Sequence, residues 1–263
     1  MSTHEHIEGM PLQNRVTPWS EIVSTRARYA DPTVMFGNRG VLHDDRRNVI
    51  RPYASKMWLC CKLNVSRTRK VQRDDNRAFN GRKRILMMPR RYTELFFLDE
   101  PTAIAAGHRP CACCRRDDYV HFVDCWSKAF PSSDVRWTAS AIDAVLHRER
   151  LQSDGKTRKT YEAALSSLPD GVFVSMSDPS TNPFGSTEDG HEPDAWLLWA
   201  GCLHHWSHFG YTERLLLSEN PARTVRVLTP KSLSATLEAG WQPGSPHVSV
   251  HSSACAAPAA RKI

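Results

Sequence analysis

Hydrophobic and polar positions along the chain follow two spacings. Short apolar runs rich in aromatic or β-branched residues predict strands; they lie at 56–65, 85–88, 92–98, 171–176, 195–206 and 224–228. The run at 195–206 fits either one buried strand or a pair. Apolar residues recur at helical spacing from Tyr119 to Phe130 and again over 138–151, so two helices are expected there. The mixture predicts an α+β class.

A third, short helix is predicted from its end signals. Asp99 suits the N-cap, and Pro101 falls in the first turn. Ala103 to Ala106 propagate the helix, and Gly107 suits the left-handed residue that ends it. A fourth helix is expected from Thr229 to Glu238, where Gly240 follows.

Polar stretches between these elements suggest how the chain is organised. Residues 1–13 predict a disordered tail and 246–263 a flexible one, while 37–40, 152–160 and 177–193 predict turns or exposed loops. We expect a small zinc-stabilised module over 14–130, with a long basic hairpin loop, and a mixed α+β region with a candidate pocket over 131–245.

Composition narrows the class of protein. With 263 residues and 40% hydrophobic content, the chain can bury a core. No apolar run approaches the roughly 18 residues of a membrane span, and Met1 to His6 lack the pattern of a secretion signal. A cytoplasmic protein without a membrane partner is therefore expected. In that compartment, eight cysteines favour a metal site or free thiols over disulfides.

Positive charge is concentrated in one part of the chain, residues 62–91, called the basic segment below. Eleven Lys and Arg residues lie there and only Asp74 and Asp75 oppose them, so the segment carries +9 in a chain of formal charge +7. Such an excess favours nucleic-acid binding through counterion release, the alternative being a solvated basic loop. The candidate phosphate contacts are Lys62, Arg67, Arg69, Lys70, Arg82, Lys83, Arg84, Arg90 and Arg91.

The cysteines supply the candidate metal ligands. Cys111 and Cys114 are separated by two residues, a spacing at which two thiolates reach one tetrahedral zinc ion. A structural site needs four ligands. Upstream, Cys60 and Cys61 are adjacent, and one thiolate of such a pair is the common choice. His108, three residues before Cys111, is expected at the surface.

The segment from Phe96 to Cys114 resembles the metal-binding module of the Ada DNA-repair protein, with an aromatic strand, a helix ending in Ala-Gly and then Arg-Pro-Cys-x-x-Cys. Related modules carry a Gly-Asn motif with a histidine, and the stretch from Phe36 to His43 is similar to a shortened form of it. The resemblance implies Zn²⁺ held by His43, one of Cys60 or Cys61, Cys111 and Cys114. It also implies contact with nucleic acid, either tRNA or DNA.

One departure from the Ada pattern limits what the resemblance implies. The upstream Cys-x-x-x-Cys pair of Ada, which holds its methyl-accepting thiolate, is missing here. Methyl transfer is therefore not expected. The whole-chain pattern is also similar to uncharacterised bacterial proteins, which adds no function.

An enzyme is the second class that the sequence leaves open. Residues 201–211 gather His204, His205 and His208 among aromatic residues, which suits general acid–base chemistry or stacking on a nucleobase. Satisfied histidines at a strand end are the alternative. The first interpretation is a zinc-containing protein that binds nucleic acid. The other is a transferase that moves the aminoacyl group of an aminoacyl-tRNA to a small molecule in this histidine pocket.

Overall fold

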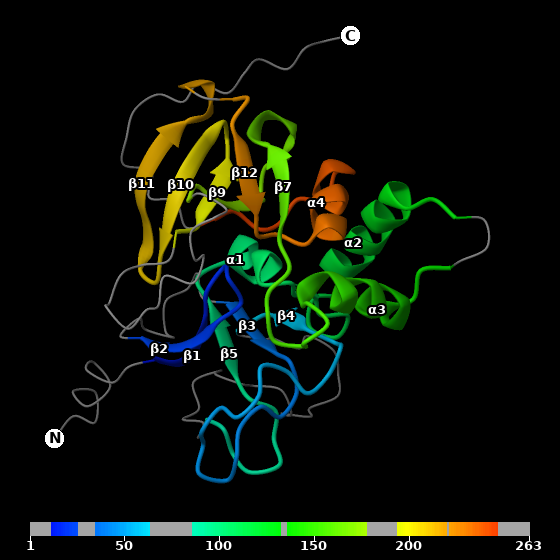
Figure 1. Cartoon of the computed structure of the whole chain (residues 1–263). Coiled ribbons are helices and arrows are strands. Elements are labelled where there is room, and N and C mark those ends of the chain that lie inside the picture. Colours follow the sequence, from blue (N-terminus) through cyan, green and yellow to red (C-terminus); the bar gives the residue numbers. More distant parts are fainter. Residues whose placement is uncertain are drawn as a thin grey trace, which may run out of the picture.

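The computed structural model describes residues 12–25, 35–63, 86–132, 136–177, 194–219 and 221–246. Two sheets, with helices between and beside them, confirm the α+β class (Figure 1). None of the helices within these ranges is long and apolar enough to cross a membrane.

The first sheet has the strand order β2-β1-β5-β3-β4-β6. Its strands are β1 (Leu12–Val16), β2 (Ile22–Thr25), β3 (Met35–Asn38), β4 (Leu59–Cys61), β5 (Leu95–Phe97) and β6 (Arg109–Pro110). β3 pairs antiparallel with both β4 and β5, whereas β6 pairs parallel with β4. The pairing of β4 with β6 places the strand that contains Cys60 and Cys61 beside the strand that directly precedes Cys111.

The second sheet is antiparallel throughout, with the order β11-β10-β9-β8-β12-β7. Its strands are β7 (Tyr161–Ala164), β8 (Phe173–Ser175), β9 (Trp196–Trp199), β10 (Cys202–Ser207), β11 (Gly210–Leu216) and β12 (Thr224–Val227). The apolar run at 195–206 is thus a hairpin of two strands, the second of the two alternatives. Short 3-10 turns lie at Leu165–Ser167 and Leu217–Glu219.

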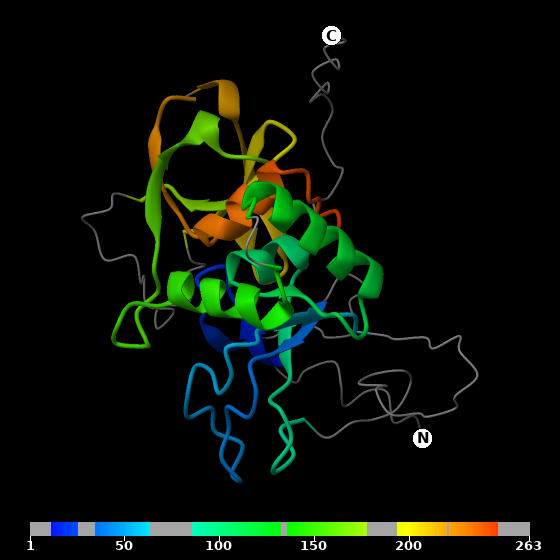
Figure 2. The same ribbon diagram turned by 90° about the vertical axis from the view of Figure 1, so that its right-hand side faces the viewer.

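Four helices complete the described fold. They are α1 (Glu100–Ala105), α2 (Arg116–Ala129), α3 (Ala139–Arg150) and α4 (Lys231–Glu238). Figure 1 places α1 between the sheets, and Figure 2 shows α2 and α3 together on one side of the molecule. Thr138 caps α3 by accepting the amide of Ala141 at 3.2 Å.

Helix α1 forms as its end signals predict. Asp99 Oδ1 accepts the backbone amide of Thr102 at 2.9 Å, Pro101 lies in the first turn, and Gly107 has a left-handed φ of 88°. All six helical residues are buried. A helix this short depends on tertiary packing, and α1 obtains it from both sheets.

The main core crosses the boundary expected at residue 130. Phe122 and Trp126 of α2 pack in one cluster with Ile142 of α3, Leu233 of α4 and residues of the second sheet. A second cluster joins Trp19 and Leu98 of the first region to strand residues of the second. The two regions therefore share apolar interior and do not pack as separate bodies.

Some expected elements differ from the structure. Leu86 and Met87 form bends and Met88 has no regular structure, so the strand expected there is not formed by these residues, and Met87 has a positive φ of 55°. The turn expected at 37–40 begins later, because Gly37 and Asn38 belong to β3. β1 starts at Leu12, inside the expected tail. Most of the predicted loop at 177–193 and of the tail after 246 lies outside the described residues.

Candidate metal centre

Three cysteine sulfurs converge at one end of the first sheet. The sulfur atoms of Cys61, Cys111 and Cys114 all lie within 4.8 Å of one another. The parallel pairing of β4 with β6 places Cys60 opposite Pro110, and the amide of Cys111 donates to the carbonyl of Cys60 at 3.0 Å. The sheet itself therefore carries Cys61 to the Cys-x-x-Cys turn.

Strand alternation decides between the adjacent cysteines. Successive side chains of a strand point to opposite faces of the sheet. Cys61 packs with Phe36, Phe96 and Cys111 on one face, whereas Cys60 joins a different cluster that contains Leu95 and Ala103. Only the face of Cys61 holds the Cys-x-x-Cys turn, so Cys61 completes the group.

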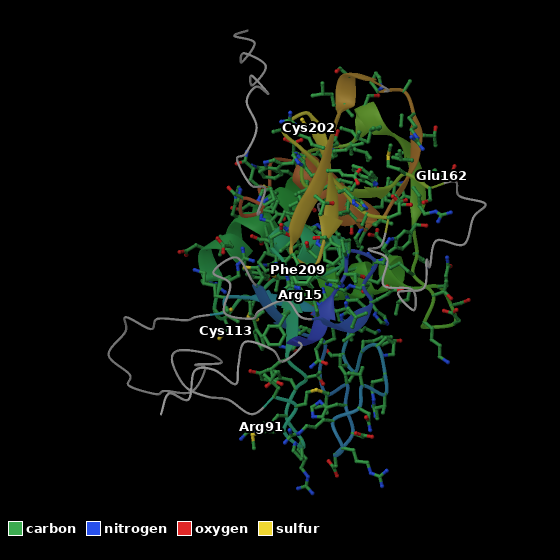
Figure 3. The ribbon with its side chains drawn as sticks, turned by 90° about the vertical axis from the view of Figure 1, so that its left-hand side faces the viewer. Arg15, Arg91, Cys113, Glu162, Cys202 and Phe209 are labelled. Atoms are coloured by element: carbon green, nitrogen blue, oxygen red, sulfur yellow. The ribbon has the colours of Figure 1, made fainter. Side chains whose placement is uncertain are left out.

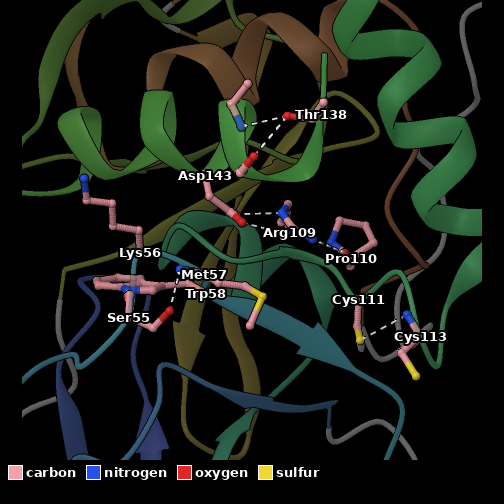
Figure 4. Close-up of polar contacts among 12 residues, drawn as sticks. Ser55, Lys56, Met57, Trp58, Arg109, Pro110, Cys111, Cys113, Thr138 and Asp143 are labelled. Carbon is pink, nitrogen blue, oxygen red and sulfur yellow. Dashed lines mark hydrogen bonds and ion pairs between the residues drawn. The ribbon is translucent and has the colours of Figure 1, made fainter. Parts of the chain in front are cut away.

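The turn at 111–114 has the local geometry of a metal knuckle. The amide of Cys113 donates to Cys111 Sγ at 3.4 Å (Figure 4), and the amide of Arg115 donates to the carbonyl of Cys111 at 3.0 Å. Backbone N–H groups aimed at a sulfur stabilise its thiolate form. Cys113 itself is exposed and does not join the group.

Hydrogen bonding within the group favours a thiolate. The Cys114 and Cys61 thiols, together with backbone amides, hold the pKa of Cys111 well below its ordinary value. Hydrogen bonding to Cys111 raises the pKa of both Cys61 and Cys114, and burial adds to the rise. One negative sulfur beside two thiols is an arrangement that a cation completes, since binding a dication releases the remaining protons.

The described residues fit a metal ion by chemistry and spacing. A tetrahedral zinc ion with Zn–S bonds of about 2.3 Å holds its sulfurs about 3.8 Å apart, and the 4.8 Å limit needs only a small closure. Phe36 lies edge-on to Phe96 and Tyr92 beside the cluster, which keeps this face apolar. Within the described residues the group has three members, so a four-coordinate ion would need one further donor.

His43 does not meet the expectation that it binds the metal. Its Nδ1 lies 2.6 Å from Thr93 Oγ1, and its Nε2 lies 3.2 Å from the carbonyl oxygen of Met88. Both ring nitrogens thus have partners outside the cysteine group. The histidine is buried and ties its own loop to the segment that leads into β5.

Cys60 is likewise placed away from the cluster. Arg115 Nη1 donates to Cys60 Sγ at 3.4 Å and forms an ion pair of 2.6 Å with Glu100 of α1. Burial raises the pKa of the Cys60 thiol. Arg115 directly follows Cys114, so this contact fixes the end of the knuckle against α1.

The basic segment is described only near its two ends. Lys62, Arg90 and Arg91 are exposed, as Figure 3 shows for Arg91. The other candidate phosphate contacts lie outside the described residues; these are Arg67, Arg69, Lys70, Arg82, Lys83 and Arg84.

The three histidines proposed as catalytic have different surroundings. His204 is buried, and its Nε2 lies 3.3 Å from the carbonyl oxygen of Trp199. His205 packs against Trp196 with its ring tilted, and its Nδ1 lies 3.2 Å from Thr212 Oγ1. His208 packs against Trp206, and its carbonyl accepts Arg15 Nη2 at 3.2 Å, near the labelled Arg15 and Phe209 of Figure 3.

The aromatic residues near these histidines hold the second sheet against the start of α1. Trp206 Nε1 donates to Thr102 Oγ1 at 3.0 Å, and Tyr211 OH donates to Asp99 Oδ2 at 2.7 Å. Both acceptors belong to the start of α1. These contacts favour a structural role for the segment expected to form a pocket.

Several buried polar residues were not anticipated. His108, expected at the surface, is fully buried between Trp58 and Phe97. Arg109 makes a two-pronged ion pair with Asp143 of α3, at 2.8 and 2.7 Å (Figure 4). Sequence alone gives no sign that Arg109 is buried, because Lys and Arg side chains are mostly exposed in folded proteins.

Comparison of the chain with protein-family models, with curated proteins and with solved structures finds no match.

Proposed function

We propose that this chain is a Zn²⁺-containing protein that binds nucleic acid through its basic segment. Cys61, Cys111 and Cys114 would hold the zinc ion. A zinc ion in such a site crosslinks β4 to the turn after β6 and supplies folding free energy. Zinc suits this set because buried thiolates are soft donors.

The observation that carries the proposal is the position of the basic segment relative to the cysteines. Lys62 directly follows Cys61 at the end of β4, and Arg91 precedes β5 by a few residues. β4 and β5 both pair with β3, so the two strands are separated by about 10 Å. Zinc bound at Cys61 would hold the start of the basic segment, at Lys62, close to its end, at Arg91.

Charge supports nucleic acid as the partner. The segment carries nine excess positive charges, and three of its described cations are exposed. Neutralising phosphates with such residues releases counterions, which makes the affinity fall steeply as salt rises. The partner is RNA or DNA, since a basic segment reads the phosphate backbone common to both.

The test measures binding of the full zinc-loaded chain to a single-stranded and a duplex oligonucleotide over a range of salt. Reversing Arg82, Lys83 and Arg84 to glutamate should weaken binding at least about a hundredfold and flatten the dependence on salt. The matched control reverses Lys128, Arg148 and Lys231, which are exposed on helices α2, α3 and α4. It changes the net charge by the same amount, and its affinity should stay near that of the native chain.

Equal losses in the two triple variants would contradict the proposal, because binding would then follow net charge and not the basic segment. Retained affinity in the segment variant would contradict it as well.

A further inference from the structure

A second cationic site lies away from the cysteines. A cavity of about 390 Å³ opens between the β1–β2 turn, the loop at 49–52 and the hairpin between α3 and β7. This volume is within the range of small-molecule sites and far too small for a duplex. Its cationic lining consists of Arg39, Arg51, Lys156 and Arg158, and Glu21 is its one carboxylate.

The deep wall of the cavity is built from buried arginines. Arg39 and Arg158 line it, and Arg150 lies behind them with its guanidinium 4.6 Å from the centre of the Trp58 ring. The guanidinium of Arg39 lies over the same ring at 4.0 Å. Arg39, Arg150 and Arg158 are respectively 1%, 0% and 6% exposed.

These arginines bond to neutral acceptors. Arg39 donates to His108 Nε2 at 3.2 Å and to Ser20 Oγ at 2.8 Å. Arg150 donates to the carbonyls of Gly107 at 2.8 Å and Lys56 at 2.7 Å. Arg158 donates to the carbonyls of Leu228 and Ala105. Cation–π contacts and carbonyls orient the three charges without neutralising them.

Among the described residues, no carboxylate lies within ion-pair distance of these three guanidinium groups. Asp143 is engaged by Arg109, and Glu149 accepts the amide and hydroxyl of Ser232. Arg150 Nη2 and both Nε and Nη1 of Arg158 are buried without a hydrogen-bond partner. Charged donors of this kind are costly to bury without an acceptor, and an anion is one group that could supply it.

Electrostatics in this region agrees with an anion site. Burial lowers the pKa of Arg150 to about 9 and that of Arg158 to about 10, which reports how poorly the charges are compensated. Burial and the neighbouring arginines also hold the pKa of His108 well below its ordinary value, so the ring stays neutral and accepts from Arg39. A bound anion would offset the mutual repulsion of the three guanidinium groups.

The residues at the rim of the cavity indicate that its ligand also has an apolar part. Exposed Arg51 and Lys156 add charge at the opening, while Val49 and Ile50 present exposed apolar surface beside them. We propose that this cavity binds a small molecule that carries a phosphate group on an apolar body. Buried Arg39 and Arg158 would face the phosphate, and Val49 and Ile50 would cover the body. The site is independent of the basic segment.

The test is calorimetric titration of the native chain with inorganic phosphate and with phenyl phosphate, at constant ionic strength set by chloride. We expect a Kd below about 1 mM for phenyl phosphate and weaker binding of inorganic phosphate. Replacing Arg51 and Lys156 by glutamine should weaken phenyl phosphate about tenfold and leave the melting temperature unchanged, because both residues are exposed. Lys128→Gln, which removes one positive charge from an exposed position of α2, is the control for a surface charge away from the cavity.

A second variant probes the deep wall. Arg158→Gln should abolish the rise in melting temperature that phenyl phosphate gives to the native chain, whatever it does to the unliganded protein. The proposal is overturned if neither probe binds, or if the rim variant and Lys128→Gln bind phenyl phosphate equally. Equal binding of the two probes would mean that phosphate alone is recognised, and it would contradict the proposal that the ligand has an apolar body.

Discussion

The two adjacent cysteines have opposite roles because they occupy opposite faces of β4. Cys61 faces Cys111 and Cys114, and Cys60 faces Arg115 and the core beside α1. The same side chain, one position apart, lies in one case in a group of three sulfurs that could hold a metal ion and in the other case accepts a buried hydrogen bond. The difference can be measured directly.

Cys61→Ser should lose most of its bound zinc, because a serine hydroxyl is a poor replacement for a thiolate. Cys60→Ser should retain zinc in full stoichiometry. The measurement is zinc content per folded chain after dialysis against a weak chelator. The assignment of Cys61 would be wrong if Cys60→Ser, and not Cys61→Ser, lost the metal.

At the scale of elements, α1 is the part that joins the two sheets. Its N-cap residue, Asp99, accepts the amide of Thr102 through Oδ1 and the hydroxyl of Tyr211 through Oδ2. One carboxylate therefore both starts a helix and holds β11 of the second sheet.

Asp99→Ala should lower the free energy of unfolding by about 2–3 kcal/mol, because it removes both the helix cap and the carboxylate that accepts the Tyr211 hydroxyl. Tyr211→Phe is the matched control, since it loses only the second of these bonds and should cost about 1 kcal/mol. Denaturant unfolding of both variants measures the difference. Equal losses would mean that the cap contributes nothing.

Prediction from sequence succeeds for elements whose signals are local. The cap, proline and glycine around α1 are such signals, and so are the apolar spacing of α2 and the Cys-x-x-Cys turn. β11 has no such signal, because most of its residues are exposed and its sequence lacks the apolar pattern that predicts a strand. The choice between Cys60 and Cys61 depends on strand register and on β6, which no local pattern specifies. His43 was expected from its motif, but its tertiary hydrogen bonds to Thr93 and Met88 place it elsewhere.

At the scale of the whole molecule, buried histidines link stability to pH. Burial lowers the pKa of His204 and His108, and burial together with Arg15 lowers that of His208 to about 4. In the unfolded chain each titrates near 6.5. The unfolded state then binds more protons, so stability is present above about pH 6.5 and is lost as the pH falls towards 4.

The free energy of unfolding should accordingly fall between pH 7 and pH 5, with His208 contributing on the order of 1 kcal/mol. His208→Gln should flatten that part of the curve, and exposed His121→Gln should not. Urea unfolding at a series of pH values measures both. A steeper fall in His208→Gln than in the native chain would contradict the assignment of a neutral, half-buried imidazole.

Cys61, Cys111 and Cys114 are expected to bind one zinc ion together. X-ray absorption at the zinc edge of the purified full chain tests this expectation most directly. We expect one zinc ion per chain, with a shell of at least three sulfur atoms at about 2.3 Å. A shell of nitrogen and oxygen atoms only, or a folded chain with no stoichiometric zinc, would contradict it.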